Sequence, residues 1–273
     1  MQCDIVALGE DLEHLVEKWR GRVILDHSVL RLDLDRGLLP SHNRNYGDIG
    51  RQVLEDLMLY QLSLHKVIGR ASVLPVNVQE YQHFPPRLEK IKEELDANSK
   101  GMLTLPEPER SRLRRAIDEF MGVSRAPGMD TLLGNQRLLL AIVKHAHILQ
   151  NYMAAHQEEH GADYKSIEDP INLYARAYDL QNGGSGMVKD APYISAAIYF
   201  ASIGEDVRVF ALDQKFGRYM DHAVRCAMSG ARNGSFSHLT TSRISVFSKS
   251  GSDSGFKEYF NFYRGEPKLL AKP

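Results

Sequence analysis

The sequence predicts an α/β fold with a central parallel sheet of four or five strands and a helical insertion. Two short apolar runs, at 22–26 and 206–213, each end in an aspartate, which is typical of a buried parallel strand with a carboxylate at its carboxyl end. Amphipathic helical patterns separate these runs, as the crossover connections of a parallel sheet require. With 273 residues and 43% hydrophobic content, the chain can bury the core that such a sheet needs.

Composition narrows the class of protein further. The formal net charge is −1, from 34 basic and 35 acidic residues, so no global basic field argues for nucleic-acid binding, and a local basic groove is left open. Two cysteines, Cys3 and Cys226, are too few for a disulfide framework or a zinc site. No apolar run approaches the roughly 18 residues of a membrane span, and the N-terminus does not resemble a secretory signal. We therefore expect a soluble, cytoplasmic protein with no membrane partner.

The first third of the chain reads as a helical extension followed by half of an α/β domain. Residues 1–21 are predicted to be an N-terminal helical extension, and residues 22–97 the first half of the domain. In the last helices of this half, Asn77 is the predicted N-cap and Glu80 lies at the third helical position, which resembles a capping box. The elements predicted here are a strand at 22–26, a helix at 48–68, a strand at 71–75, a helix that opens at Asn77 and a charged helix at 86–97.

The remainder is predicted as an insertion, the second half of the domain and a tail. Strand signals are nearly absent from 98–186, which we interpret as a helical insertion, whereas 187–249 returns to the α/β pattern. The aromatic residues of the C-terminal tail, 250–273, are expected to pack a terminal helix or an oligomer interface, or to stack on bases. The elements predicted here are helices at 107–120, 134–156, 171–178, 189–201 and 216–228, and strands at 206–213 and 243–247.

Four acidic residues are candidates for one site. Asp26 and Asp213 end two predicted strands, and Glu80 and Asp190 lie near the starts of two helices. The carboxyl ends of parallel strands meet at one edge of a sheet, where ligands bind. Carboxylates in this number repel one another unless a cation is present, and Mg²⁺ or Mn²⁺ suits an all-oxygen site. The alternative for each aspartate is helix N-capping or loop solvation, which is the better explanation of Asp190 taken singly, whereas the three aspartates together favour the metal site.

The order and context of these acids resemble the motifs of the PIN-domain family of metal-dependent nucleases. The resemblance covers about half of the chain, residues 22–97 and 187–247, and His27 stands where the family usually has Thr or Ser. The matching stretches are LDHSVL at 25–30, VLPVNVQEY at 73–81, KDAPYISAAIYFA at 189–201 and VFALDQKFGRYM at 209–220, through Asp26, Glu80, Asp190 and Asp213 respectively.

This resemblance implies a three-layer α/β/α fold and a Mg²⁺- or Mn²⁺-dependent endoribonuclease. Such a hydrolase cleaves RNA phosphodiester bonds with metal-activated water. It implies that Asp26, Asp190 and Asp213 hold the metal and that Glu80 completes the site. Single-stranded RNA is the expected partner, and a protein partner or a homo-oligomer is left open. The candidate substrate-binding residues, which fall near the strand ends, are Ser28, Lys189, Lys215 and Arg218.

Two alternatives stand beside the nuclease. The first is a catalytically weak or inactive PIN-like scaffold that binds RNA or protein, which His27 and the long helical segment favour. The second is another metal-dependent phosphohydrolase that acts on small phosphorylated substrates. Against the second, the glycine-rich stretch at 183–186 does not lie between a strand and the lysine of a phosphate-binding loop.

Overall fold

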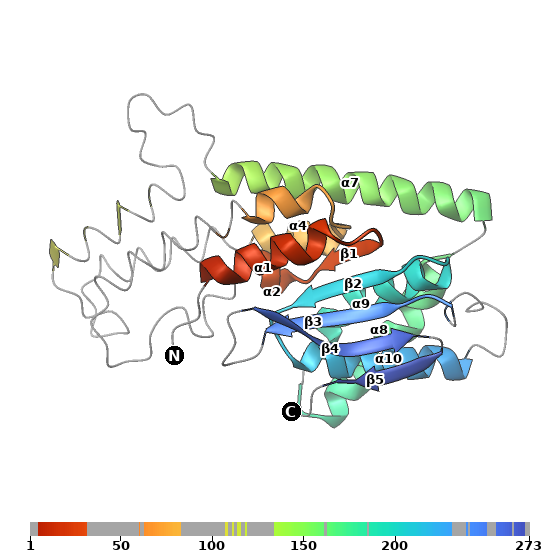
Figure 1. Cartoon of the computed structure of the whole chain (residues 1–273). Coiled ribbons are helices and arrows are strands. Elements are labelled where there is room, and N and C mark those ends of the chain that lie inside the picture. Colours follow the sequence, from red (N-terminus) through yellow and green to blue (C-terminus); the bar gives the residue numbers. More distant parts are fainter. Residues whose placement is uncertain are drawn as a thin grey trace.

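In the computed structural model of this chain, five strands form one sheet with helices packed against it (Figure 1). Within the described residues, no helix is both long and apolar enough to cross a membrane. The structure describes residues 5–31, 60, 63–82, 107–108, 111, 114–115, 118, 134–160, 163–184, 186–230, 239, 241–249, 255–263 and 265–270.

The sheet combines parallel and antiparallel strands. Its strands, in sequence and in spatial order, are β1 (Arg22–Leu25), β2 (Val207–Ala211), β3 (Ile244–Lys249), β4 (Phe256–Tyr263) and β5 (Glu266–Leu269). The β1–β2 and β2–β3 pairs are parallel, whereas β3–β4 and β4–β5 are antiparallel. The predicted α/β class is therefore confirmed. The prediction of a parallel central sheet is wrong for its last two strands, because the segment predicted as a C-terminal tail returns as a hairpin on the edge of β3.

The predicted second strand, 71–75, is reduced to a single bridge. Ser72 pairs in parallel with Ile24 of β1, on the side of β1 opposite to β2. Helix α4 (Pro75–Gln82) begins three residues later, because proline has no N–H to extend a ladder and suits the first turn of a helix. The chain thus leaves β1 toward Ser72 and returns on the other side as β2. The carboxyl end of β1 is accordingly the point where the winding of the sheet reverses, which is where open α/β sheets bind ligands.

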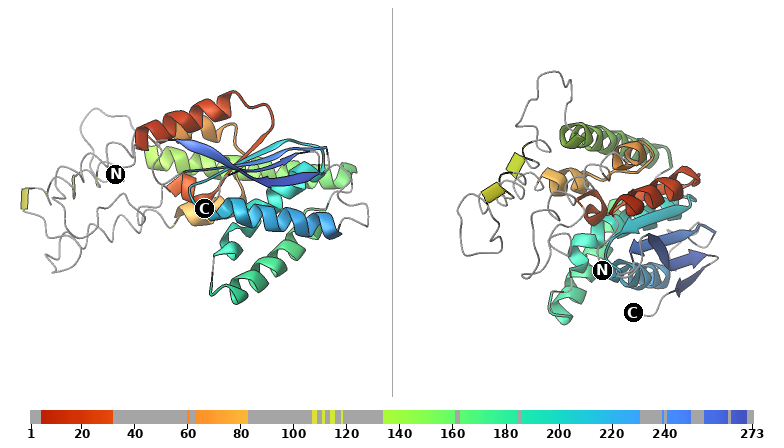
Figure 2. Two further views of the ribbon diagram at one scale, coloured as in Figure 1. Left: turned by 60° about the horizontal axis from the view of Figure 1, so that its bottom comes forward. Right: turned by 60° about the vertical axis from the view of Figure 1, so that its left-hand side comes forward.

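Helices pack against both faces of the sheet, as Figure 2 shows with α1 and α10 on opposite sides. Helix α9 packs against β1, β2 and β3, and α10 packs against β3, β4 and β5. Helix α8 packs along α9, and α7 packs along α4. The remaining bounds are α1 (Ile5–Glu17), α2 (His27–Arg31), α7 (Gly134–His160), α8 (Lys165–Gln181), α9 (Met187–Ser202) and α10 (Lys215–Gly230).

The predicted helices agree with the structure wherever the structure describes them. The helices predicted at 134–156, 171–178, 189–201 and 216–228 are confirmed as α7, α8, α9 and α10, each with wider bounds. Residues 63–68 are helical, at the end of the helix predicted over 48–68. Most of that helix and the charged helix at 86–97 lie outside the described residues. The domain boundaries stay predictions.

The strands contribute alternate side chains to two buried clusters, one on each face of the sheet. In β1, Val23 and Leu25 pack with α1, whereas Ile24 packs with α9. In β2, Phe210 belongs to the first cluster and Val209 to the second. A strand that is buried on both faces reads as a continuous apolar run, and this explains why the first two strands were predictable.

An ion pair fixes the start of β1, at the opposite end of the strand from Asp26. The Arg22 guanidinium donates two hydrogen bonds of 2.7 Å to the Glu205 carboxylate, and the Tyr152 hydroxyl donates a third at 2.7 Å. The guanidinium also lies over the rings of Tyr152 and Phe200, at 4.7 and 4.6 Å from their centroids. Burial alone would raise the pKa of Glu205, but the hydrogen bonds from Arg22 and Tyr152 lower it below its usual value.

Candidate metal centre

Asp26 follows β1 directly and is held by backbone bonds on both sides. Its N–H donates to the Phe210 carbonyl at 2.9 Å, which extends the β1–β2 pairing by one residue. Its carbonyl accepts the N–H groups of Val29 and Leu30, so that α2 begins at once. The Asp26 residue is 2% exposed. The carboxylate therefore has a fixed position between the carboxyl ends of β1 and β2.

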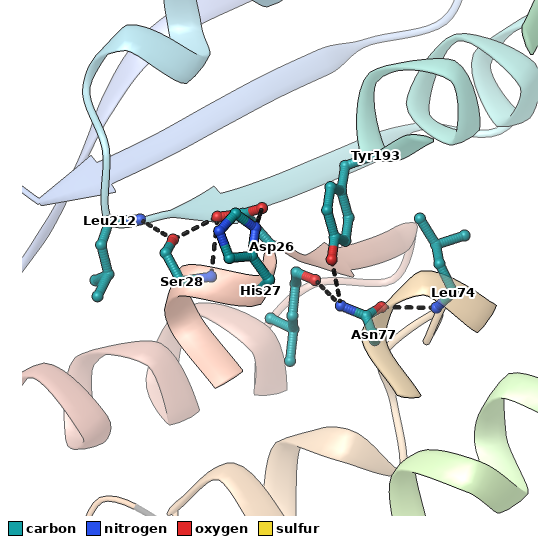
Figure 3. Close-up of polar contacts among 8 residues, drawn as sticks. Asp26, His27, Ser28, Leu74, Asn77, Tyr193 and Leu212 are labelled. Carbon is teal, nitrogen blue, oxygen red and sulfur yellow. Dashed lines mark hydrogen bonds and ion pairs between the residues drawn. The ribbon is translucent and has the colours of Figure 1, made fainter. Parts of the chain in front are cut away.

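Two donors from Ser28 and the imidazole of His27 approach this carboxylate within the described part of the chain (Figure 3). Oδ2 accepts the Ser28 N–H at 3.1 Å and the Ser28 hydroxyl, and Oδ1 lies 2.8 Å from Nδ1 of His27. The Ser28 Oγ in turn accepts the Leu212 N–H at 3.0 Å, just beyond β2. Asp26 thus caps α2, which is the helix N-capping role expected as the alternative to metal binding. Ser28 also ties the carboxylate to the end of the neighbouring strand.

Asp190 reaches the same place from the first turns of α9. The residue before α9, Gly186, has a φ of 95°, a left-handed conformation that favours glycine. The Asp179 carboxylate of α8 accepts the N–H groups of Met187 and Val188 at 2.9 and 3.1 Å. These bonds satisfy two of the donors that a helix start leaves unpaired. They fix the entry of α9 and hence the position of Asp190.

Asp26, His27 and Asp190 form the closest group of ligand atoms. Each offers one atom, and the three atoms lie within 4.8 Å of one another. Among the described residues, no other three histidine, cysteine, aspartate or glutamate side chains meet this condition. Burial raises the pKa of Asp190 to about 9, and the carboxylates of Asp26 and Asp213 contribute to the rise. In the metal-free protein, burial and the neighbouring carboxylates therefore favour the protonated form of Asp190.

Asp213 lies beside this group rather than within it. It follows β2 by two residues, and its carboxylate accepts the Lys215 N–H at 2.9 Å at the start of α10. Its carbonyl accepts the Phe216 N–H at 3.2 Å. The N-terminal turn of α10 thus explains its place in the structure, and its charge acts on Asp190 across the site.

The Asn77 side chain links three elements next to the site by hydrogen bonds (Figure 3). Its Oδ1 accepts the Leu74 N–H at 2.7 Å, and its Nδ2 donates to the Leu25 carbonyl at 3.1 Å and to the Tyr193 hydroxyl at 3.0 Å. Asn77 is 1% exposed. It lies inside α4 rather than at its N-cap, so that the predicted capping arrangement is wrong. Instead, this one side chain connects the end of β1, the start of α4 and the α9 residue one turn beyond Asp190.

The structure brings together part of the predicted site. Asp26 and Asp190 meet, and Asp213 is near them. Glu80 belongs to α4, but its side chain lies outside the described part of the chain, and its role stays a prediction. Lys189, Lys215 and Arg218 are exposed on α9 and α10, and Ser28 is buried against Asp26. Substrate contacts by these four residues stay predictions.

The sequence does not predict the roles that three residues play at the site. His27 differs from the family pattern, and its adjacency to Asp26 is the available signal for a ligand. Asp179 lies in the segment predicted to be an insertion, and its contact with α9 joins residues eight and nine positions apart around the glycine-rich turn. Asn77 was identified, but with a local role. Its actual partners lie 52 and 116 residues away, at Leu25 and Tyr193, and no local pattern reveals such contacts.

The donor set fits a divalent cation. Two carboxylates and one imidazole are within 4.8 Å of one another, and a third carboxylate adds to the negative potential. Mg²⁺ and Mn²⁺ bind carboxylate oxygens, and Mn²⁺ also follows the transition metals in accepting imidazole nitrogen.

Fold and site together define an α/β protein with a carboxylate–imidazole cluster at the reversal point of its sheet. No family model, no curated protein and no solved structure matches the chain. The comparisons therefore do not identify a PIN domain, and membership of that family stays a prediction from the order and context of the motifs.

Proposed function

We propose that this chain is a PIN-like endoribonuclease that depends on Mg²⁺ or Mn²⁺. The observation that carries the proposal is the meeting of Asp26 and Asp190, which are 164 positions apart in the sequence, at the carboxyl ends of β1 and β2. The order of acids that resembles the PIN motifs supports the choice of nuclease over other metal-dependent hydrolases. Buried core residues on both sides of the sheet support the three-layer arrangement.

Side chains of this protein would hold the metal and pair with the RNA phosphates. Asp26 and Asp190 would hold the metal, and Asp213 adds negative charge beside them. When bound, the metal would activate water and neutralise charge on the phosphodiester. Ser28 and Asn77 keep Asp26 in place through bonds to β2 and α9. Lys189, Lys215 and Arg218 present exposed cations on the helices that start at the site, where they would pair with RNA phosphates.

One observation favours the second candidate, a catalytically inactive scaffold. Nδ1 of His27 lies 2.8 Å from the Asp26 carboxylate, so a protonated imidazole would itself neutralise part of the site. A scaffold of this kind would bind RNA or protein without cleaving it.

The deciding experiment is a cleavage assay on the full chain. A single-stranded RNA and a DNA of the same sequence are incubated with Mn²⁺ or Mg²⁺, or with a chelator. The variants are Asp26→Asn, Asp190→Asn and Asp213→Asn, and Asp169→Asn on the exposed side of α8 is the control. We expect metal-dependent RNA cleavage by the wild type and the control, and at least about a hundredfold loss in Asp26→Asn and Asp190→Asn. Equal cleavage by all variants, or none with either metal, would exclude the nuclease.

A further inference from the structure

His27 lies in the position of a metal ligand, although the sequence pattern did not mark it as one. It is the first residue of α2, directly after Asp26, so that the helix start that fixes the carboxylate also fixes the imidazole. Its side chain is 15% exposed. The ring lies 6.1 Å from that of Tyr193, centroid to centroid, on the next turn of α9 after Asp190. The imidazole is therefore inside the site and not on the surface around it.

The contact with Asp26 orients the ring. Nδ1 of His27 lies 2.8 Å from Asp26 Oδ1, close enough for both atoms to contact one cation, so Nδ1 is the ring nitrogen placed to bind, with the ring proton on Nε2. Both Ser28 donors bind Oδ2 of Asp26, whereas Oδ1 faces the imidazole.

We propose that His27 binds the metal through its imidazole and selects a first-row transition ion, such as Mn²⁺, over Mg²⁺. This inference rests on the proposed metal site. Mg²⁺ prefers an all-oxygen shell and loses its waters reluctantly, whereas transition ions accept nitrogen ligands. An imidazole in place of one oxygen donor therefore makes the affinity for the transition ion higher than the affinity for Mg²⁺, whereas an all-carboxylate site would bind the two ions alike.

The test reads the ligand directly rather than through activity. Full-length protein labelled with ¹⁵N-histidine and unlabelled protein are loaded with Mn²⁺, and nitrogen coordination is measured by pulsed electron paramagnetic resonance. Mn²⁺ and Mg²⁺ affinities are measured by calorimetry. The variant is His27→Thr, and the control is His147→Thr, an exposed histidine on α7. The labelled wild type gives a result even if the variant does not fold.

We expect directly coordinated nitrogen that changes from ¹⁴N to ¹⁵N with the label in the wild type and in His147→Thr. In His27→Thr this signal is lost, and the Mn²⁺ affinity falls about tenfold or more while the Mg²⁺ affinity changes less than about threefold. Mn²⁺ bound without coupled nitrogen would overturn the inference and leave the metal site intact. Mn²⁺ binding by His27→Thr but not by the wild type would also overturn the inference, since His27 would then compete with the metal. If neither protein binds Mn²⁺, the inference and the proposed function both fail.

Discussion

Replacing Asp190 with asparagine should stabilise the metal-free protein, and the gain should grow with pH. Burial, with help from neighbouring carboxylates, raises the pKa of Asp190 from 3.8 to about 9. Between these values the folded state keeps a proton that the unfolded state has released. Folding stability therefore falls as pH rises through this window. Asparagine has no proton to release, so its variant does not carry this penalty.

The size of the effect follows from linkage. One proton of difference between the folded and unfolded states changes the free energy of unfolding by up to about 1.4 kcal/mol per pH unit. From pH 5 to pH 7 the upper limit is therefore about 2.7 kcal/mol. Asp190 is only partly shielded from solvent, which screens its interactions, and we expect an increase of about 1–2 kcal/mol over that interval.

Urea unfolding at pH 5, 6, 7 and 8 in a chelating buffer measures this difference. The wild type, Asp190→Asn and the control Asp169→Asn are compared, with the urea dependence required to stay constant. Adding Mn²⁺ at a hundred times its dissociation constant should then stabilise the wild type by about 2.7 kcal/mol and leave Asp190→Asn nearly unchanged. If the wild-type and Asp190→Asn curves run parallel across the pH series, the buried-carboxyl argument is refuted.

Three further variants test the supports of the site. Asn77→Ala should lower the free energy of unfolding, measured in urea, by about 2–4 kcal/mol, because it leaves buried partners without hydrogen bonds. The control Gln79→Ala, on the exposed side of α4, should change this free energy by less than about 0.5 kcal/mol. Asp179→Ala should cost about 0.5–2 kcal/mol by removing the cap of α9 and should weaken Mn²⁺ binding in calorimetry. Glu205→Gln should cost about 1–3 kcal/mol near neutral pH, and the loss should shrink in acid unfolding curves. Because the pKa of Glu205 is lowered in the folded protein, its pairing with Arg22 stabilises the fold at pH values above the ordinary pKa of glutamate. This stabilisation is lost as the pH falls through the pKa of the folded state. A loss of stability that does not vary with pH would contradict this.

The parts of the site that the sequence predicted are those with a local signal. Asp26 and Asp213 follow continuous apolar runs, and two-sided burial of β1 and β2 explains those runs. Asp190 lies near the start of a helix rich in small residues, and that helix packs across three strands. These features depend on neighbours in the sequence, so that periodicity reveals them.

The last two strands are not predicted from the sequence: β5 is largely exposed and has no buried face, and a register shift moves the buried side chains of β4 between faces. A bulge between Val246 and Phe247 changes the pairing with β4. As a result, Phe256 packs with α1, whereas Phe260 and Phe262 pack on the opposite face. Their spacing would place all three on one face of a regular strand. With Tyr259 and Tyr263 at the other parity and Glu258 among the phenylalanines, aromatic residues occupy both faces of the pattern, and the segment is interpreted as part of a tail.

The packing of α1 on β4 bears on how this chain folds during synthesis. The Asp11 carboxylate of α1 accepts the Phe256 N–H at 2.7 Å, across 245 residues. Helix α1 thus packs on a strand that is synthesised long after it, and β1 is likewise synthesised long before its partner β2. Contacts of such long range slow folding. During synthesis α1 and β1 have residues 63–72 as an early partner, whereas the apolar surface that β2 and β4 cover stays accessible to chaperones until those strands emerge.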